Sequence, residues 1–132
     1  RLGDPETEVI IPRLKSDIID LFEGVGSNTL SERDIQFFDK SAATVMMVSG
    51  GYPKSYKKGK QIYGLNNILD SLVFHAGTSA DGPSIKTEGG RVLSVTSYGR
   101  TLEKALEKSY ENISKISFDN AYFRKDIGHD VL

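Results

Sequence analysis

Apolar residues recur at helical spacing in the first part of the chain. Between residues 6 and 22 apolar residues recur at Val9, Ile10, Leu14, Ile18, Leu21 and Phe22. This spacing indicates an α-helix with one solvent-exposed polar face. Pro12 interrupts the pattern, and proline lacks an amide hydrogen and clashes with the preceding turn. We therefore expect two short helices, the first entered at Pro5 and the second capped by Ser16 or Asp17.

The rest of the chain is rich in β-branched residues and is interrupted by glycines. The apolar run 42–48 (AATVMMV) has the length and composition of a strand buried on both faces. Further short strands are predicted at 61–65, 72–78, 84–87 and 91–97. The Asp-Gly pair at 81–82 and the Gly-Gly pair at 89–90 predict antiparallel hairpins between these strands.

A long amphipathic helix is predicted from Thr101, which can cap it, to about Ile116. Its apolar stripe consists of Leu102, Ala105, Leu106, Tyr110, Ile113 and Ile116. Such a stripe must be buried against the sheet. The fold class expected is therefore α+β: a short helical lead, a polar connecting segment at 27–40, and a small antiparallel β-sheet or partial barrel packed by one long helix.

Composition narrows the possible functions. The chain has 132 residues, 17 basic and 18 acidic, which fits one globular domain with no overall attraction for nucleic acid or anionic membrane. No apolar run approaches the roughly 18 residues of a membrane span. The absence of cysteine excludes disulfides and thiol catalysis and agrees with a cytoplasmic protein. Two histidines are too few for a histidine-rich metal site.

Two glycine- or lysine-rich stretches have both a plain and a functional interpretation. In KSYKKGK at 54–60, lysines lie among tyrosines, which suits a solvated hairpin, a small-molecule phosphate site or a nucleic-acid surface. In EGGR at 88–91, two unhindered amides precede a guanidinium, which suits either a tight turn or an anion site. His75 is either a strand residue with a satisfied ring or a general base.

The first eight residues, RLGDPETE, combine a guanidinium with two carboxylates that flank a proline. A helix start alone accounts for Asp4 and Glu6, because the positive end of a helix favours acids. It does not account for Arg1. An arginine beside carboxylates suits a zwitterionic substrate or a transferring phosphoryl group, whose charge the guanidinium compensates.

The chain resembles a known family in several ordered motifs. These are RLGDPETE, PRLKSD, SGGYP, VFHAGT, EGGRVLSVT and RKDIG. In this order, and over essentially all 132 residues, they resemble the C-terminal third of the glycinamide ribonucleotide synthetases, also called phosphoribosylamine–glycine ligases, of the ATP-grasp superfamily. Leu2 stands where phenylalanine is usual in the family, which alters packing rather than chemistry.

The resemblance implies the reaction that joins glycine to 5-phosphoribosylamine, with ATP converted to ADP and phosphate, in purine biosynthesis. Arg1 and Asp4 would then be catalytic, with Glu6 as a second carboxylate for the glycine ammonium group. Phosphoribosyl binding would use the amides of Gly89 and Gly90 and the side chain of Arg91, with Lys58 and His75 as weaker candidates. ATP with Mg2+ or Mn2+ would be held by residues upstream, with no metal ligand in this fragment.

The resemblance also implies an organisation in three parts. Residues 1–26 would be the end of an ATP-grasp domain, 27–40 a connection, and 41–132 the synthetase C-terminal domain, with a rudimentary single hybrid motif. Such a fragment should be inactive alone, and its bare apolar helix face, including Val9, Ile10 and Leu14, should promote self-association. A monofunctional, bacterial-type protein is expected. The alternative is a non-catalytic β-rich module that binds RNA or a protein partner.

Overall fold

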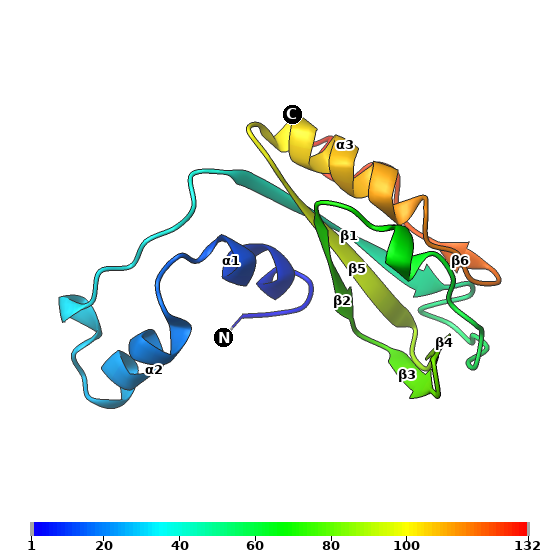
Figure 1. The fold of residues 1–132 in the computed structure, drawn as a ribbon, viewed down its shortest axis with the longest axis horizontal. Coiled ribbons are helices and arrows are strands. Elements are labelled where there is room, and N and C mark those ends of the chain that lie inside the picture. The colour runs from blue at the N-terminus through cyan, green and yellow to red at the C-terminus, as the bar shows by residue number, and fades with distance from the viewer. Residues whose placement is uncertain (1, 132) are drawn as a thin grey trace.

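The computed structural model describes residues 2–131 and has an α+β fold built on a four-stranded antiparallel sheet (Figure 1). The strands are β1 (Ser41–Ser49), β2 (Ser71–His75), β3 (Thr78–Asp81), β4 (Ser84–Thr87), β5 (Arg91–Gly99) and β6 (Ala121–Tyr122). The helices are α1 (Thr7–Arg13), α2 (Ile18–Gly26) and α3 (Leu102–Ile113), with 3-10 turns η1 (Leu30–Glu32) and η2 (Leu65–Asn67). The predicted fold class, an antiparallel sheet packed by one long helix, is confirmed at this level.

Strand β5 is central in the larger sheet, whose order is β2-β5-β1-β6. It pairs antiparallel with β1, where Val45 lies opposite Val95, and with β2, where Val73 lies opposite the same residue. A register shift follows Met47 in β1. Strands β3 and β4 form a separate two-stranded sheet.

The main core lies between the larger sheet and α3. It contains Val45, Met47, Ile62, Val92, Leu93, Val95, Ile113, Ile116 and Phe118, each at most 6% exposed. In β1 every second residue from Ala43 to Ser49 is buried, while the residues between them are only half-buried. The prediction that this strand is buried on both faces is therefore wrong: helix α3 covers one face fully, and the other face has only partial cover.

Helix α3 begins as predicted and ends earlier. The Thr101 side chain accepts a hydrogen bond from the Lys104 amide at 3.4 Å. The helix ends at Ile113 rather than near Ile116, and the Ser114 hydroxyl donates to the Glu111 carbonyl at 2.7 Å. That bond satisfies one of the carbonyls left free at a helix end. Ile116 nevertheless joins the core, so the apolar stripe continues into the following turn.

Two buried polar residues connect α3 to the sheet. The Asn112 amide group donates to the Leu69 carbonyl at 3.1 Å and to the Ser71 hydroxyl at 2.8 Å. The Ser109 hydroxyl donates to the Ala43 carbonyl at 2.9 Å. Because buried polar groups are costly when unpaired, these bonds fix the position of the helix along the sheet.

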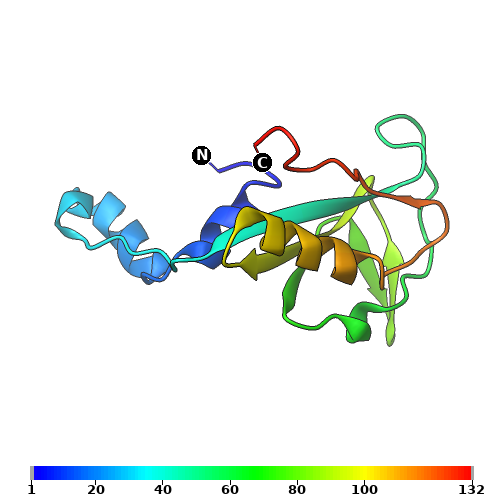
Figure 2. The same ribbon diagram turned by 90° about the horizontal axis from the view of Figure 1, so that it is seen from above.

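The two helices predicted before the sheet are confirmed. Pro12 lies in the last turn of α1, and the chain leaves the helix at Leu14. Helix α2 is capped by Asp17, whose carboxylate accepts from the Ile19 amide at 2.8 Å. Both views show α2 and η1 as an arm that extends away from the sheet (Figures 1 and 2).

Among the helices that precede the sheet, the most exposed apolar side chains are on α2, not on α1. Ile19, Phe22 and Val25 are each about three-fifths exposed, at 60%, 62% and 59%. On α1 and just after it, Val9 and Leu14 are half-buried because α1 packs against β1 and β5, whereas Ile10 is 38% exposed. Of the three residues named for the bare apolar face, only Ile10 is thus exposed, and self-association through this face stays a prediction.

Three predicted strands or turns are wrong. Residues 61–65 form only isolated bridges, because Gln61 pairs with Lys86 and Tyr63 with Ser117, and at Gly64, with a left-handed φ of 85°, the chain turns into η2. The predicted strand 72–78 is divided after His75, where β2 ends and the chain passes to the second sheet. The Asp-Gly hairpin at 81–82 is confirmed between β3 and β4, whereas Gly-Gly at 89–90 connects strands of different sheets.

The core predicts a contrast between two leucine substitutions. Leu93→Ala, at a site that is 0% exposed, should lower the free energy of unfolding by about 2–5 kcal/mol, because it removes packed methyl groups and leaves a cavity. Leu69→Ala, at a site that is 68% exposed, should change it by less than about 0.5 kcal/mol. Urea denaturation of both variants measures this, and equal losses would contradict the assigned core.

Candidate functional site

Several turns meet at the start of β5, where the sequence predicts anion binding. The Ser49 amide donates to the Gly90 carbonyl at 2.8 Å, and the Ser49 hydroxyl donates to the Gly89 carbonyl at 2.9 Å. The amides of Glu88 and Gly89 both donate to the Gly77 carbonyl, at 2.8 and 3.0 Å. The SGGYP, HAGT and EGGR motifs are therefore in direct contact, although they lie far apart in the sequence.

Glycine is required here by close backbone approach. A Cβ at Gly77 would lie 2.6 Å from the Gly89 Cα and 2.5 Å from the Arg91 carbonyl oxygen. A Cβ at Gly90 would overlap the ring of Tyr52. Because backbone atoms cannot move aside as a flexible side chain can, larger residues at Gly77 would separate the two turns.

The predicted anion-binding amides differ in their surroundings. The Gly89 amide donates its hydrogen to the Gly77 carbonyl, so it cannot donate to an anion while that bond is kept. Gly90 is buried beneath the Tyr52 ring. Of the three residues predicted to bind an anion, only Arg91 has an exposed side chain, at 41%.

Arg91 forms a bidentate contact with Asp4 across 87 residues of sequence. Its Nη2 lies 2.9 Å from Asp4 Oδ2, and its Nη1 donates to the Asp4 carbonyl at 3.3 Å. The two side chains are 41% and 42% exposed, so solvent screens the pair and its contribution to stability is small. The contact joins two residues that the sequence assigned to different substrate groups.

Of the other two residues predicted near Asp4, the structure describes Glu6 but not Arg1. Glu6 folds back over Gly3, where an added Cβ would overlap its carboxylate. It therefore lies in the same turn as Asp4. Arg1 lies outside the described residues, so the predicted proximity of Arg1 to Asp4 stays a prediction.

Lys58 and His75 lie in polar contacts at the surface near the converging turns. Lys58 Nζ is 3.1 Å from a carboxylate oxygen of Glu88, which is three residues before Arg91. His75 Nδ1 is 2.9 Å from the Thr78 hydroxyl, across the short link between β2 and β3. Both candidates are thus placed beside the EGGR or HAGT turns, and both are exposed.

A second polar bond attaches α1 to β5, at the opposite end of the strand from Arg91. The Tyr98 hydroxyl donates to the Pro12 carbonyl at 2.6 Å, which satisfies a free carbonyl in the last turn of α1. Burial raises the pKa of Tyr98, so the hydroxyl remains a donor well above neutral pH. Sequence reasoning missed Tyr98, because nothing local to it indicates a contact with residue 12.

Neither a metal cluster nor a membrane span is found in the part of the chain that the structure describes. Within residues 2–131, no three or more histidine, aspartate or glutamate side chains are grouped so that they could hold a metal ion. None of the helices described there has the length and apolar character needed to cross a membrane.

Comparison with known proteins identifies the family. The family model described as phosphoribosylglycinamide synthetase, C domain, matches residues 42–130. The chain belongs to this family. The matched range starts at the second residue of β1 and includes the rest of the larger sheet and α3.

Relatives named phosphoribosylamine–glycine ligase match almost the whole chain. The Clostridium acetobutylicum protein is 44% identical over 128 residues, which cover 97% of this chain and 30% of that protein. The Chlorobaculum tepidum protein is 44% identical over 135 residues, which cover 100% of this chain and 32% of that protein. The chain therefore spans about three-tenths of the length of these relatives.

A solved structure of the same kind is similar in fold. The crystal structure of the Thermotoga maritima phosphoribosylamine–glycine ligase has a TM-score of 0.73 and 32% sequence identity to this chain. The match covers 96% of this chain and 31% of that protein, so it extends over the helical arm as well as the sheet.

The close contact of the HAGT and EGGR turns predicts the effect of one added methyl group. Gly77→Ala should lower the free energy of unfolding by about 1–3 kcal/mol, because the backbone of Gly89 and Arg91 must move. Gly26→Ala, at the end of α2 with no atom within 4 Å of the added Cβ, should be neutral or stabilise by up to about 1 kcal/mol. Chemical denaturation distinguishes them, and a neutral Gly77→Ala would contradict the assigned contact.

Proposed function

We propose that this chain is the C-terminal part of a phosphoribosylamine–glycine ligase. The reaction joins glycine to 5-phosphoribosylamine and converts ATP to ADP and phosphate, giving glycinamide ribonucleotide in purine biosynthesis. The observation that carries the proposal is 44% identity to a curated ligase over 97% of the chain. The contact of Asp4 with Arg91 adds support, because it joins the GDPE and EGGR motifs at one site.

The organisation proposed is that of a catalytic core with a small covering domain. Residues 1–26 would complete an ATP-grasp domain, and residues 41–132 would form the C-terminal domain with a rudimentary hybrid motif. Residues 27–40 would connect the two domains. The exposed apolar face of α2 supports this division, since an arm with no buried hydrophobic side chain needs a partner surface. In its absence the same face would promote self-association of the fragment.

The chemistry proposed has two steps. ATP transfers its γ-phosphoryl group to the glycine carboxylate, which gives glycyl phosphate and ADP. The amine of phosphoribosylamine then attacks the acyl carbon, phosphate leaves, and the nitrogen loses a proton. Arg1 would compensate the negative charge of the carboxylate and the transferring group.

Asp4, Glu6 and Arg91 would position the two substrates. The ion pair with Arg91 engages Oδ2 of Asp4, so Oδ1 can accept a hydrogen bond from the glycine ammonium group. Glu6, in the same turn, is the second carboxylate proposed for that ammonium. Arg91 is half-exposed and has further guanidinium donors for the ribose phosphate, with the Gly89–Gly90 turn forming the floor and Lys58 and His75 at the edge.

ATP and its Mg2+ or Mn2+ would be held by residues outside this chain. The described residues contain no carboxylate cluster that fits a metal ion, so no step of the mechanism is assigned to a metal here. A soluble cytoplasmic enzyme that acts on small molecules, with no nucleic-acid or membrane partner, is the setting proposed for this chemistry.

The proposed roles predict a difference between two arginine substitutions in the complete ligase. Arg91→Ala should lower kcat/KM for phosphoribosylamine by about 10- to 100-fold, because a charged hydrogen bond to phosphate contributes about 1.5–3 kcal/mol. Arg1→Ala should lower turnover by about 10²–10³-fold. Arg124→Ala, which removes an exposed arginine paired with Asp126, is the matched control.

Glycine-dependent ADP release, measured with and without phosphoribosylamine, reports both effects. Normal turnover in correctly folded Arg1→Ala would remove Arg1 from the mechanism. An equal loss of activity in Arg91→Ala and Arg124→Ala would mean that Arg91 has no specific role.

The alternative is a module that binds RNA through the lysine-rich stretch at 54–60. The ion pairs in this region argue against it, because Lys58 is paired with Glu88 and Lys60 lies 3.1 Å from a carboxylate oxygen of Asp119. Partly neutralised lysines release few counterions on binding.

We therefore expect no appreciable binding of single-stranded RNA by this chain. Filter binding at 50 and at 200 mM salt tests this: a genuine phosphate-binding surface weakens steeply with salt, by about 10³-fold or more for six or more phosphate contacts. Tight binding at low salt with that steep decline would favour the RNA-binding alternative.

A further inference from the structure

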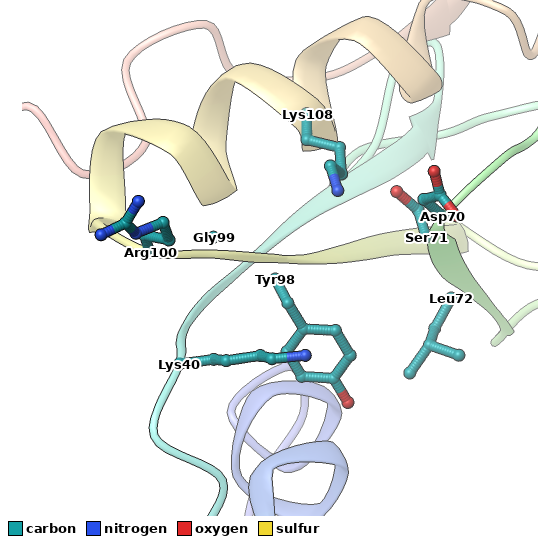
Figure 3. A pocket seen from close by; sticks show the side chains of 8 residues that line it. All are labelled: Lys40, Asp70, Ser71, Leu72, Tyr98, Gly99, Arg100 and Lys108. Carbon is teal, nitrogen blue, oxygen red and sulfur yellow. The ribbon is translucent and has the colours of Figure 1, made fainter.

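A pocket at the far end of β5 lies apart from the candidate site. It is lined by the end of β5, the start of β2, one side of α3 and the segment that leads into β1, and its volume is about 600 Å³. Figure 3 shows Lys108 and Asp70 on the α3 side of β5, Lys40 beside the Tyr98 ring with Leu72 nearby, and Arg100 at the rim with its guanidinium directed away from the two lysines. This volume is in the range of small-molecule sites, about 300–1,000 Å³.

The pocket is about one strand length from Arg91. Both sites border β5, which begins at Arg91 and reaches the pocket at Tyr98 and Gly99. Eight residue steps at about 3.3 Å each separate Arg91 from Gly99 by about 26 Å. A ligand in this pocket therefore occupies a different place from the substrates proposed above.

The three cations that line the pocket have no acidic partner within ion-pair distance. Among residues 2–131, no ion pair within 4 Å includes Lys40, Arg100 or Lys108. Five other lysines are paired with acids, whereas Lys15, Lys54, Lys57 and Lys125 are exposed and unpaired among the described residues. The pairs are Lys58–Glu88, Lys60–Asp119, Lys86–Asp81, Lys104–Glu107 and Lys115–Glu111.

The charge of the lining is opposite in sign to that of the chain. Three cations and one carboxylate, Asp70, line the pocket, while the whole chain has a formal net charge of −1. Positive charges gathered in a hollow attract anions more strongly than the same charges spread over a surface. Arg100 adds a planar group that can bind phosphate oxygens in a bidentate manner.

The uncharged part of the lining is apolar or already hydrogen-bonded. Leu72 is 40% exposed although it lies in β2. Tyr98 gives its hydroxyl hydrogen to Pro12, and Lys40 Nζ lies 5.9 Å from its ring centroid. The Ser71 hydroxyl is shared with Ser97 and Asn112. A ligand here would therefore meet cations and an apolar wall rather than neutral hydrogen-bonding groups.

We propose that this pocket binds a phosphorylated small molecule that carries an apolar or aromatic group. The phosphate lies between Lys40 and Lys108, with Arg100 at the rim of the pocket, and the apolar group lies against Leu72 and Tyr98. Asp70 disfavours ligands with additional negative charge near β2. The proposal rests on the unpaired cations and the apolar wall, and it does not depend on the ligase reaction.

Titration of the 132-residue chain with phenyl phosphate, followed by amide chemical shifts in NMR, tests the proposal. Saturating shifts are expected at Leu72, Tyr98, Gly99 and Lys108, with a Kd of about 1 mM or below for a ligand of this size. Inorganic phosphate, which lacks the ring, should bind at the same residues about threefold or more weakly. Pyrophosphate tests whether the site recognises charge alone. Tighter binding of pyrophosphate than of phenyl phosphate would overturn the apolar part of the proposal.

Matched double variants separate a specific site from general charge attraction. Lys40→Gln with Lys108→Gln should raise the Kd for phenyl phosphate about tenfold or more, which corresponds to at least about 1.4 kcal/mol. Lys54→Gln with Lys125→Gln removes the same charge from exposed lysines outside the pocket and should change the Kd by less than about twofold. The amide spectra of the variants also show whether they are folded.

Three results would overturn the proposal. The first is the absence of saturation at 20 mM phenyl phosphate in the original chain. The second is an equal loss of affinity in both double variants. The third is binding by an acidic peptide, at the same residues, that is tighter than binding by phenyl phosphate, which would identify the pocket as a contact for polypeptide.

Discussion

The structure depends on strand β5, which is hydrogen-bonded on both edges and packed or attached on both faces. Its pairing with β1 and β2 places Val92, Leu93 and Val95 in the core, each fully buried. One face of β5 carries α3. Near the two ends of the strand, Arg91 contacts Asp4 in the turn before α1, and Tyr98 contacts Pro12 in the last turn of α1. The helical lead is thus positioned relative to the sheet by one strand.

This arrangement explains how distant motifs form a single site. The GDPE turn reaches the EGGR turn only because α1 lies against the sheet with its start beside Arg91. The HAGT turn reaches the same place because two glycines let backbones approach to within contact distance. Electrostatics contributes little stability to these contacts, since the Asp4–Arg91 pair is exposed, and close packing of the turns is the stronger constraint.

Membership of the synthetase C-domain family agrees with the division of the molecule into a sheet with its own core and an arm without one. The family match starts within β1, and no hydrophobic side chain before Ala43 is fully buried among the described residues. The residues before the sheet therefore contribute no fully buried hydrophobic side chain to the core of the described chain. At the far end of β5, the unpaired cations around the pocket form a second feature that the family resemblance did not indicate.

The sequence by itself determined the local elements whose signals are local. The helical spacing around Pro12, the caps at Asp17 and Thr101 and the Asp-Gly hairpin all depend on residues a few positions apart, and ordered motifs indicated the family. Only the tertiary structure decided that Gly89 and Gly90 connect two sheets, that Arg91 contacts Asp4, and that Tyr98 binds Pro12. These contacts join residues that are tens of positions apart, and their free energy comes from the packing of the whole sheet, which no local pattern records.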